Sequence, residues 1–460
     1  MSNINTIYSS LSPWAQNLSC TAYGILKNRE RQGYEFYNYY HSLLKSEFDS
    51  AELIRKNQQN SLRKVLKNAS INNPYYRDIF RSFNLEHNNY YELLEKIPIL
   101  TKEKIIKNKD KLISSNINKN KLINAKTSGS TGTALSFYTT KSLIAFQWAV
   151  WWRYRRRFSF LPKQWHVNFT GKPVIKIDQL NPPFWRIDYA RKQVIICSSQ
   201  LNNKKIKYIL DFINRKKINI FTGYPSIVTQ FCELIISNSL SLDFKPSLVT
   251  LGAEKCYEYQ KKIIHQVTGA LITDQYGISE GCANASKCQY GNYHEDSEFS
   301  YLECLDKVQN KDGSYTGKVI ATSLINNSFP FIRYQTGDTA TWAPNNFKCP
   351  CGRESKVLLR IEGRIEDYVL TSDGNKFMRF DYLFKETSSI KEAQIYQKEI
   401  DYITIRYIPR DDFKKDDLEK IRKLSSEYIS PLLKINFEEV NEIERTKSGK
   451  FKAVISDIKK

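Results

Sequence analysis

The sequence predicts an α/β protein with a large N-terminal domain of mixed β-sheets and flanking helices, followed by a small C-terminal α+β domain. The chain of 460 residues is about three times the length of a common single domain. From about residue 120, short runs rich in β-branched and aromatic residues alternate with segments of helix length. After residue 363 two alternating apolar runs, a helix and a further strand follow. We therefore expect domains at 1–363 and 364–460.

Residues 1–120 are expected to form a helical N-terminal part of the large domain. Apolar residues recur there at three- and four-residue spacing, for example over 42–65, which is typical of amphipathic helix. Pro74 and Pro98 interrupt this pattern and mark short linkers into further helices.

The central part is expected to contain a largely parallel sheet, because strand and helix patterns alternate along it. The predicted strands are 135–140, 192–197, 217–223, 246–252, 270–277 and 317–324, and the clearest helices between them are 204–215 and 227–237. In the small domain we expect strands at 393–398, 402–408 and 434–440, with a helix at 414–428.

Composition excludes several classes of protein. Hydrophobic residues make up 41% and aromatic residues 13%, which argues against a disordered or fibrous chain. Nine dispersed cysteines favour a reducing compartment over a disulfide framework. No apolar run approaches the roughly 18 residues of a membrane span, and the N-terminus lacks a signal-peptide pattern. We expect a cytoplasmic protein without a transmembrane segment.

The net charge is strongly positive, since 70 Lys and Arg stand against 48 Asp and Glu, giving +22. Such a charge attracts polyanions, including nucleotide phosphates, anionic lipid surfaces and nucleic acid. It is equally typical of a solvated basic surface.

A Ser/Gly-rich segment at 127–133 has the composition of a phosphate-binding loop. Its glycines let successive N–H groups curve around an anion, and its hydroxyls add donors. The segment lacks the Gly-Lys-Ser/Thr of a Walker A loop, and an ordinary surface loop is the competing interpretation.

Two further motifs offer groups that suit a nucleotide. In the stretch 274–280, Tyr276 provides an aromatic face, Ser279 a hydroxyl, and Glu280 a hard oxygen ligand for Mg²⁺. In 333–338, Asp338 is a carboxylate that can accept from two vicinal hydroxyls.

Two cationic side chains complete the set of motifs. Arg364 follows Gly363, and Lys450 lies in the sequence TKSGK, which is typical of a turn. Each motif is weak alone, but five in this order indicate a nucleotide-dependent enzyme.

With these motifs the sequence resembles the adenylate-forming superfamily of acyl- and aryl-CoA ligases, in particular the phenylacetate–CoA ligase-like group and its capsular polysaccharide biosynthesis branch. The resemblance runs from about Pro74 to the C-terminus and includes NPYYR at 73–77, IPILTK at 97–102, TGYPS at 222–226 and LGAEK at 251–255. It implies a large N-terminal domain, a mobile C-terminal lid and an ATP site between them. It also implies activation of a carboxylic acid as acyl-adenylate with release of pyrophosphate, then transfer to coenzyme A or another thiol or amine.

The resemblance also implies the roles of individual residues. The β- and γ-phosphates would be held by Ser128, Gly129, Ser130, Thr131 and Gly132. The adenine pocket would be lined by Gly252, Ala253 and Glu254, with Tyr276 stacking on the base, and Asp274 and Gly277 would also belong to the nucleotide site. Ser279 would approach the α-phosphate, Glu280 would bind Mg²⁺, Asp338 would bind the ribose with Arg364 nearby, and Lys450 would bridge the carboxylate and α-phosphate. The hinge would fall at Glu366 or Asp367.

Three alternatives compete with this interpretation. An adenylating acyltransferase would pass the acyl group directly to an amine of a sugar precursor. A basic nucleic-acid-binding module would not explain Glu280, Asp338 and Lys450 in this order, so no nucleic acid is expected. A degenerate nucleotide binder would be expected to have lost Lys450 or Glu280.

Four further residues, Cys288, His294, Cys349 and Cys351, form a candidate structural zinc site. The Cys-Pro-Cys-Gly sequence presents two thiolates together, and four protein ligands would close the coordination sphere. Cys282 is the alternative ligand, and four unrelated side chains are the competing interpretation.

Other residues carry weaker signals. His166 either lines an acyl pocket or belongs to the core or surface, and the aromatic residues of 148–154 either form a pocket wall or pack in the core. The arginine-rich run 153–157 either contacts an anionic partner, such as coenzyme A phosphates or a lipid-linked sugar, or forms a solvated helix face. The remaining thiols are expected to be packed small hydrophobes: Cys20, Cys197, Cys232, Cys256 and Cys304.

Overall fold

The computed structural model describes residues 7–86, 89–126, 135–171, 174–176, 179–364, 369–372, 376–377, 383, 387, 389–428, 430, 432–444, 452 and 454–458. Its helices are α2 (Pro13–Arg31), α3 (Tyr34–Lys45), η1 (Ser46–Phe48), α4 (Ala51–Asn72), α5 (Pro74–Phe80), α6 (Tyr90–Lys96), α7 (Lys102–Lys107), η2 (Lys119–Lys121), α8 (Lys141–Arg156), η3 (Ser198–Gln200), α9 (Ile206–Lys216), α10 (Pro225–Ser237), α11 (Glu258–Thr268) and α13 (Lys415–Tyr428).

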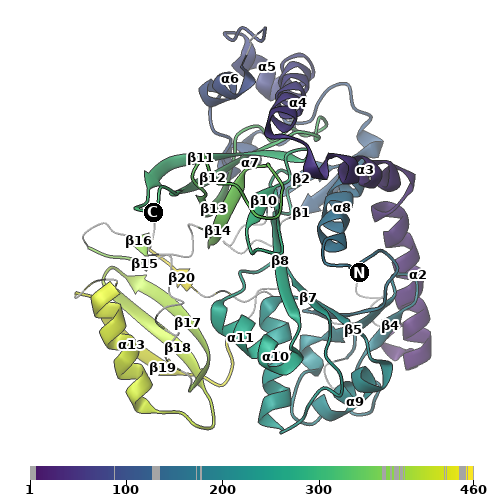
Figure 1. The fold of residues 1–460 in the computed structure, drawn as a ribbon, viewed down its shortest axis with the longest axis vertical. Coiled ribbons are helices and arrows are strands. Elements are labelled where there is room, and N and C mark those ends of the chain that lie inside the picture. The colour runs from purple at the N-terminus through teal and green to yellow at the C-terminus, as the bar shows by residue number, and fades with distance from the viewer. Residues whose placement is uncertain are drawn as a thin grey trace.

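A long mixed sheet runs through the large domain (Figure 1). Its strands, in spatial order, are β11 (Ser300–Gln309), β12 (Tyr315–Ser323), β13 (Tyr334–Trp342), β14 (Val357–Arg364), β10 (Tyr293–Glu295), β9 (Asn284–Lys287), β8 (Leu271–Gly277), β7 (Leu248–Leu251), β6 (Ile220–Gly223), β3 (His166–Thr170), β5 (Gln193–Cys197) and β4 (Arg186–Asp188). The five strands from β8 to β5 are parallel, and the pairs from β11 to β8 are antiparallel. A separate hairpin joins β1 (Ile123–Lys126) to β2 (Ser136–Thr139).

The parallel strands are apolar on both faces, and each face buries a different set of helices. On β6, Phe221 packs into a cluster with α9, α10 and α11, whereas its neighbour Ile220 packs with α3 and α8. Side chains alternate along a strand, so these two adjacent residues serve opposite faces. The carboxyl ends of the parallel strands are left free to form a site, as is usual in such sheets.

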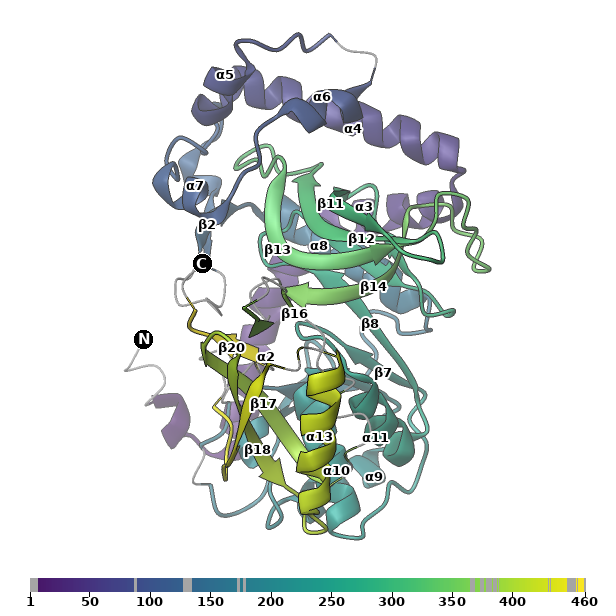
Figure 2. The same ribbon diagram turned by 90° about the vertical axis from the view of Figure 1, so that its left-hand side faces the viewer.

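The antiparallel strands β11 to β14 curve around a second core. Helices α4 to α7 cover them in Figure 2, and residues such as Leu66, Leu94 and Phe331 belong to one buried cluster. This core and the parallel-strand core meet along β8 and β9.

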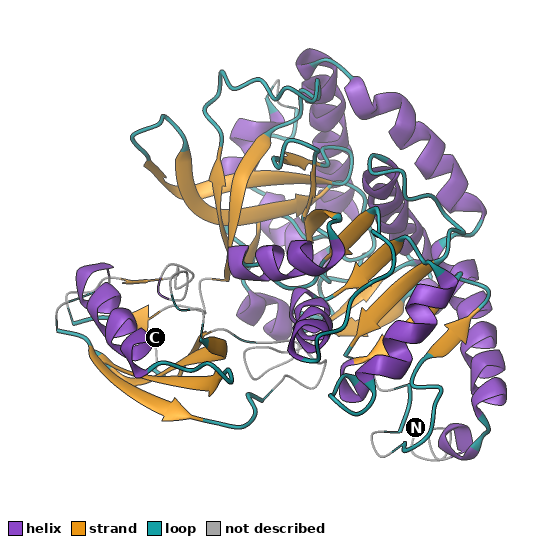
Figure 3. Cartoon of the chain, turned by 60° about the horizontal axis from the view of Figure 1, so that its bottom comes forward, coloured by secondary structure: helices purple, strands orange, loops and turns teal. Residues whose placement is uncertain are grey.

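The small domain begins beyond β14 and is built on a four-stranded sheet (Figure 3). Its strands are β15 (Val369–Leu370), β16 (Lys376–Phe377), β17 (Ile390–Glu399), β18 (Tyr402–Pro409), β19 (Lys434–Glu439) and β20 (Val454–Ser456), of which the last four form the sheet in the order β19-β18-β17-β20. Helix α13 packs on it through Ile421. An ion pair of 2.9 Å between Arg410 and Glu233 of α10 connects the two domains.

The mixed α/β fold expected from the sequence is confirmed, and the predicted strands correspond to β2, β5, β6, β7, β8 and β12. The helical pattern expected at 42–65 is confirmed, but it is divided between successive helices. The chain forms α3, the short η1 and then α4, because the Ser50 hydroxyl accepts from the Leu53 N–H at 3.3 Å and caps a new helix. The domain division at 363 and 364 stays a prediction. Among the described residues, no helix is both long and apolar enough to cross a membrane.

Candidate active site

A cleft of about 1440 Å³ lies between the carboxyl ends of the parallel strands and the small domain. Gly223, Thr250 and Tyr276 line it from β6, β7 and β8, and Val454 to Asp457 line it from β20 and the residues after it. A space of this size can hold a nucleotide together with a second small molecule. Of the predicted site residues, the lining includes Gly252, Ala253, Glu254, Asp274, Tyr276, Gly277, Ser279 and Asp338.

The turn after β7 lies at the edge of this cleft. Ala253 has a φ of +66°, a left-handed conformation that costs a residue with a side chain about 1 kcal/mol. Glu254 accepts from the Ser226 N–H at 3.2 Å, at the start of α10. Backbone strain of this kind is concentrated at functional sites, where the surrounding contacts hold it. The turn therefore presents backbone groups to the cleft in a fixed position.

Tyr276 and Asp338 join the two halves of the sheet inside the cleft. The Tyr276 hydroxyl donates to Oδ2 of Asp338 at 2.6 Å. Burial, the nearby Asp338 charge and this hydrogen bond raise the Tyr276 pKa well above its ordinary value, so the phenol stays protonated. The carboxylate is thereby held in place at the cleft.

Asp274 lies two residues before Tyr276 on β8, and its carboxylate is also fixed by a tyrosine hydroxyl. Its Oδ1 accepts from the Tyr293 hydroxyl at 2.5 Å and pairs with Lys287 at 2.8 Å. Both partners come from the β9–β10 hairpin. Asp274 and Lys287 therefore form a charged part of the cleft wall.

Glu280 and Ser279 lie in the turn that follows β8. Ser279 is exposed to the cleft, whereas Glu280 is only 5% exposed and accepts from the Tyr334 hydroxyl at 3.0 Å. Tyr334 is in the 333–338 motif, so this contact connects two of the predicted motifs.

Several predicted site residues lie outside the described residues. These are Ser128, Gly129, Ser130, Thr131, Gly132, Lys450, Glu366 and Asp367. Arg364 is described only as the last residue of β14, where its backbone pairs with Asp338 in the ladder. Their roles stay predictions.

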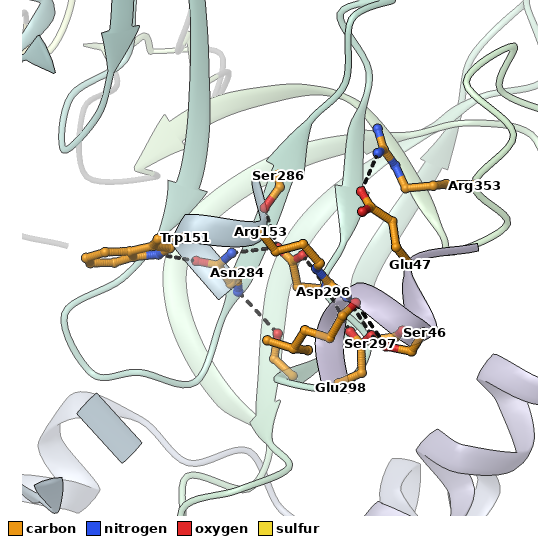
Figure 4. A network of polar contacts seen from close by, with 12 residues as sticks. Ser46, Glu47, Trp151, Arg153, Asn284, Ser286, Asp296, Ser297, Glu298 and Arg353 are labelled. Atoms are coloured by element: carbon orange, nitrogen blue, oxygen red, sulfur yellow. Dashed lines mark hydrogen bonds and ion pairs between the residues drawn. The ribbon is translucent and has the colours of Figure 1, made fainter. Parts of the chain in front are cut away.

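Trp151 forms a wall of the cleft and is fixed by a buried network (Figure 4). Its indole N–H donates to Oδ1 of Asn284 at 3.0 Å, and the Asn284 amide donates to Asp296 at 2.6 Å. Asp296 also accepts from Arg153 at 2.8 Å, and Arg153 is two residues beyond Trp151 on α8. A Cβ on Gly277 would approach Asn284 Oδ1 to 2.7 Å, so glycine is needed there. The network thus sets the position of α8 against the cleft.

The arginine-rich run 153–157 is divided by the helix into three environments. Arg153 is buried in ion pairs with two carboxylates, and Arg157 pairs with Glu47 at 2.5 Å. Arg156 is exposed, and Arg155 lines the cleft. A continuous solvated face is therefore wrong for this run.

Cys288, His294, Cys349 and Cys351 are brought together at the β9–β10 hairpin and the loop before β14. Their donor atoms all lie within 4.8 Å of one another. Cys288 Sγ is 3.7 Å from Cys349 Sγ, and Cys351 Sγ is 3.2 Å from His294 Nε2. Zinc–sulfur bonds of 2.3 Å at tetrahedral angles would place two sulfurs about 3.8 Å apart. The donor set and spacing fit a closed tetrahedral metal site.

The other thiols are placed as expected. Cys282, the alternative ligand, lies in the apolar core under β11 to β14 rather than in this cluster. Cys20, Cys197, Cys232 and Cys256 are buried, and Cys304 is half-buried.

Some residues of the cleft were not found from the sequence. Tyr23 and Arg31 reach it from α2, and no motif marks them. Tyr334 and Lys287 act through Glu280 and Asp274. Tyr334 lies in the 333–338 motif, so the sequence indicated that it was near the site. Its contact with Glu280 could be known only from the fold.

Comparisons with known proteins agree with this arrangement. Residues 369–457 match the family described as the CapK C-terminal domain. The chain is 24% identical to Protein CapK of Staphylococcus aureus over 462 residues, which is 99% of this chain and 100% of that protein. The similarity therefore includes the first helices, ahead of Pro74.

Two further relatives share shorter regions. Phenylacetate–coenzyme A ligase of Pseudomonas putida is 28% identical over 193 residues, 40% of this chain and 42% of that protein. Indoleacetate–lysine synthetase of Pseudomonas savastanoi is 30% identical over 132 residues, 28% of this chain and 31% of that protein.

Among solved structures, 2-hydroxyisobutyryl-CoA ligase in the postadenylation state, in complex with R3-HIB-AMP, has the same fold. The TM-score is 0.66 at 17% identity, with 90% of this chain and 92% of that chain covered. The fold, the full-length similarity to CapK and the matching C-terminal domain confirm the resemblance of this chain to the adenylate-forming superfamily, to its phenylacetate–CoA ligase-like group and to CapK.

Proposed function

We propose that this chain is an AMP-forming acid ligase, which activates a carboxylic acid with ATP as an acyl-adenylate, releases pyrophosphate and then transfers the acyl group to an acceptor. The observation that carries the proposal is the convergence of the Ala253 turn, the Tyr276–Asp338 pair and Ser279 in one cleft that β20 of the small domain also lines.

The residues of the cleft suit this reaction. Asp338 would accept from the ribose hydroxyls, with its geometry set by Tyr276. The turn at 252–254 would contact the adenine, and Ser279 would donate to the α-phosphate. The serine- and glycine-rich residues 128–132 would bind the outer phosphates.

Charge compensation is the main requirement of the first step, because a carboxylate must approach a phosphate. At about 4 Å and an effective dielectric constant of about 20, one positive charge offsets roughly 4 kcal/mol. We assign this role to Lys450, which would bridge the two anions. The attacking carboxylate is already ionised, so no general base is needed.

The residues beside Ser279 fit Mg²⁺. Glu280 is a buried carboxylate with a defined orientation, since it accepts from Tyr334, and carboxylate oxygen is a preferred ligand of this ion. When bound, the ion would supply further positive charge at the phosphates.

We propose a thiol, coenzyme A in the first place, as the acceptor. Direct transfer to an amine is the second candidate, and the 30% identity to indoleacetate–lysine synthetase over 132 residues favours it. The full-length similarity to CapK supports a role in surface polysaccharide biosynthesis.

We further propose that Cys288, His294, Cys349 and Cys351 hold a structural Zn²⁺. Four protein ligands leave no open position for a substrate, so the ion would tie the β9–β10 hairpin to the loop before β14. That hairpin supplies both partners of Asp274 in the cleft.

Pyrophosphate exchange and hydroxylamine trapping with a panel of carboxylic acids test the ligase. We expect activity in the wild type and its loss, by about 100-fold or more, in Lys450→Ala. Lys434→Ala, at an exposed position on β19, is the matched control and should retain activity. Salt-dependent retention of DNA without ATP turnover would instead support a nucleic-acid-binding module.

A further inference from the structure

One end of the cleft contains two arginines that form no ion pair with any carboxylate the structure describes. Arg31 of α2 and Arg155 of α8 line both the main cleft and a side pocket of about 160 Å³ that opens beside it. The two helices pack against each other, so residues far apart in the sequence share this end. By volume the side pocket would accommodate roughly five water molecules, or one small polar group.

Neither arginine has an ion pair or a side-chain hydrogen bond within the described part of the chain. Arg31 lies 4.4 Å from the Trp148 ring centroid, and Arg155 lies 4.9 Å from that of Trp152. Nε of Arg155 is buried without a hydrogen-bond partner. Aromatic faces hold both guanidinium groups, but they leave the N–H donors unused.

Two carboxylates whose charges act on this end of the cleft, Asp188 on His166 and Glu30 on Arg31, form ion pairs with other cations. Asp188 pairs with Arg191 at 2.5 Å and also accepts from Gln193. Glu30 pairs with Lys27 at 2.5 Å. Within the described residues, neither Arg31 nor Arg155 therefore has a carboxylate as its own ion-pair partner.

The electrostatic environment of these arginines is unfavourable to their charge. Burial and the nearby Arg31 charge lower the pKa of Arg155 to about 10, so it is still charged at neutral pH. His166, in the same side pocket, has a pKa lowered to about 4 by burial and by Arg155 and Arg191, and is therefore neutral. Buried charges are normally paired, and two unpaired arginines in a cleft suit an anionic ligand.

We propose that Arg31 and Arg155 form a subsite for a second oxyanion group on the acid substrate, a carboxylate or a phosphate, at the end of the molecule away from the carboxylate that is activated. This inference rests on the proposed function and specifies its substrate class. The planar guanidinium fork matches either oxyanion. Asn168 and Thr222, which line both cavities, add neutral polar groups that suit hydroxyls on the connecting part of the substrate.

Matched acids test the subsite through pyrophosphate exchange. Succinate and glutarate are compared with their monoamides, which keep the shape and lose one charge, and 3-phosphonopropionate tests phosphate-type anions. For the wild type we expect kcat/KM for a dianionic acid to exceed that for the matched monoamide by about 30-fold or more, the size of a buried charged contact. Whichever of the diacid and the phosphonate has the higher kcat/KM shows whether the subsite binds a carboxylate or a phosphate-type group.

Three variants assign the preference to the two arginines. Arg155→Met and Arg31→Met should lower exchange with dianionic acids to within a few-fold of the monoamides, while the KM for ATP is unchanged. Arg156→Met, one position along α8 and exposed, removes the same charge and should keep the preference. Melting temperatures of all variants show that folding is intact.

The outcomes separate this inference from the proposed function. Exchange that is equally fast with neutral and dianionic acids would overturn the subsite and leave the ligase standing. An effect of Arg155→Met confined to acceptor-dependent thioester formation, with exchange unchanged, would also overturn it. If no acid supports exchange, the ligase fails, and calorimetric titration with glutarate and 3-phosphonopropionate decides the subsite. Binding that is lost in Arg155→Met supports it, and no binding to the wild type overturns it.

Discussion

The Tyr276 hydroxyl donates a hydrogen bond of 2.6 Å to Asp338, a residue 62 positions further along the chain. This contact connects a strand of the parallel half of the sheet to one of the antiparallel half. Because the donor is fixed, one Asp338 oxygen is occupied and the carboxylate has a set orientation toward the cleft.

The first prediction concerns this pair. Asp338→Asn should raise the KM for ATP about 10- to 100-fold, since a hydrogen bond to a charged group contributes about 1.5–3 kcal/mol. Tyr276→Phe should raise it less, about 3- to 10-fold, because only the orienting contact is lost. Pyrophosphate exchange at saturating acid measures both. Use of 2′-deoxy-ATP and ATP with equal efficiency by the wild type would contradict ribose binding by Asp338.

The second prediction concerns the network behind Trp151. Arg153→Ala should lower the free energy of unfolding by about 3–5 kcal/mol, because the buried Asp296 and the half-buried Glu298 would lose their cation. Arg156→Ala on the same helix is exposed and should change it by less than about 0.5 kcal/mol. Denaturant titration compares the two, and similar values for both variants would contradict the network's role.

The third prediction concerns the Cys/His cluster. Purified protein should contain about one equivalent of zinc, and Cys349→Ser should lose it and melt at a lower temperature, since a closed site contributes folding free energy. Cys304→Ser, at a half-buried cysteine outside the cluster, should keep the metal. Elemental analysis measures the content, and less than about half an equivalent in the wild type would reject the site.

The fourth prediction is a pH dependence of stability from Glu295. Burial raises its pKa to about 7, compared with 4.5 in an unfolded chain. Between these values the folded state keeps a proton that the unfolded chain has released, so stability is lost as the pH rises from 4.5 to 7.

Glu295→Gln cannot ionise, and its amide oxygen can still accept from the Leu302 N–H, which lies 2.6 Å from the native carboxylate. The variant should gain stability relative to the wild type on going from pH 4.5 to pH 8, by on the order of 2 kcal/mol. Glu258→Gln, at an exposed position, should show no such gain. A constant difference across this range in chemical denaturation would refute the proposed cause.

The fold and several residues that line the cleft could be predicted from the sequence because both depend on local patterns. Strand and helix alternation predicted the parallel sheet, and the turns after β7 and β8 carry the motifs at 251–255 and 274–280. The Cys/His cluster was found because thiols and imidazoles have few roles that fit their spacing.

The other end of the cleft could not be predicted in this way. In the sequence, nothing distinguishes Arg31 from the other basic residues of a polar helix. Only the packing of α2 against α8 brings it beside Arg155. The arginine-rich run 153–157 likewise has three environments that its composition does not reveal. They arise because successive residues of a helix point about 100° apart, and each side of the helix packs against a different part of the structure.

The position of α2 has a consequence for how related enzymes diverge. This outer helix supplies Arg31 to the proposed subsite for the acid, so under our proposal part of the selectivity of the cleft is encoded in a peripheral segment. If that one segment were exchanged between homologous proteins, we expect the preference among acids to change and the residues proposed for adenylation to stay the same.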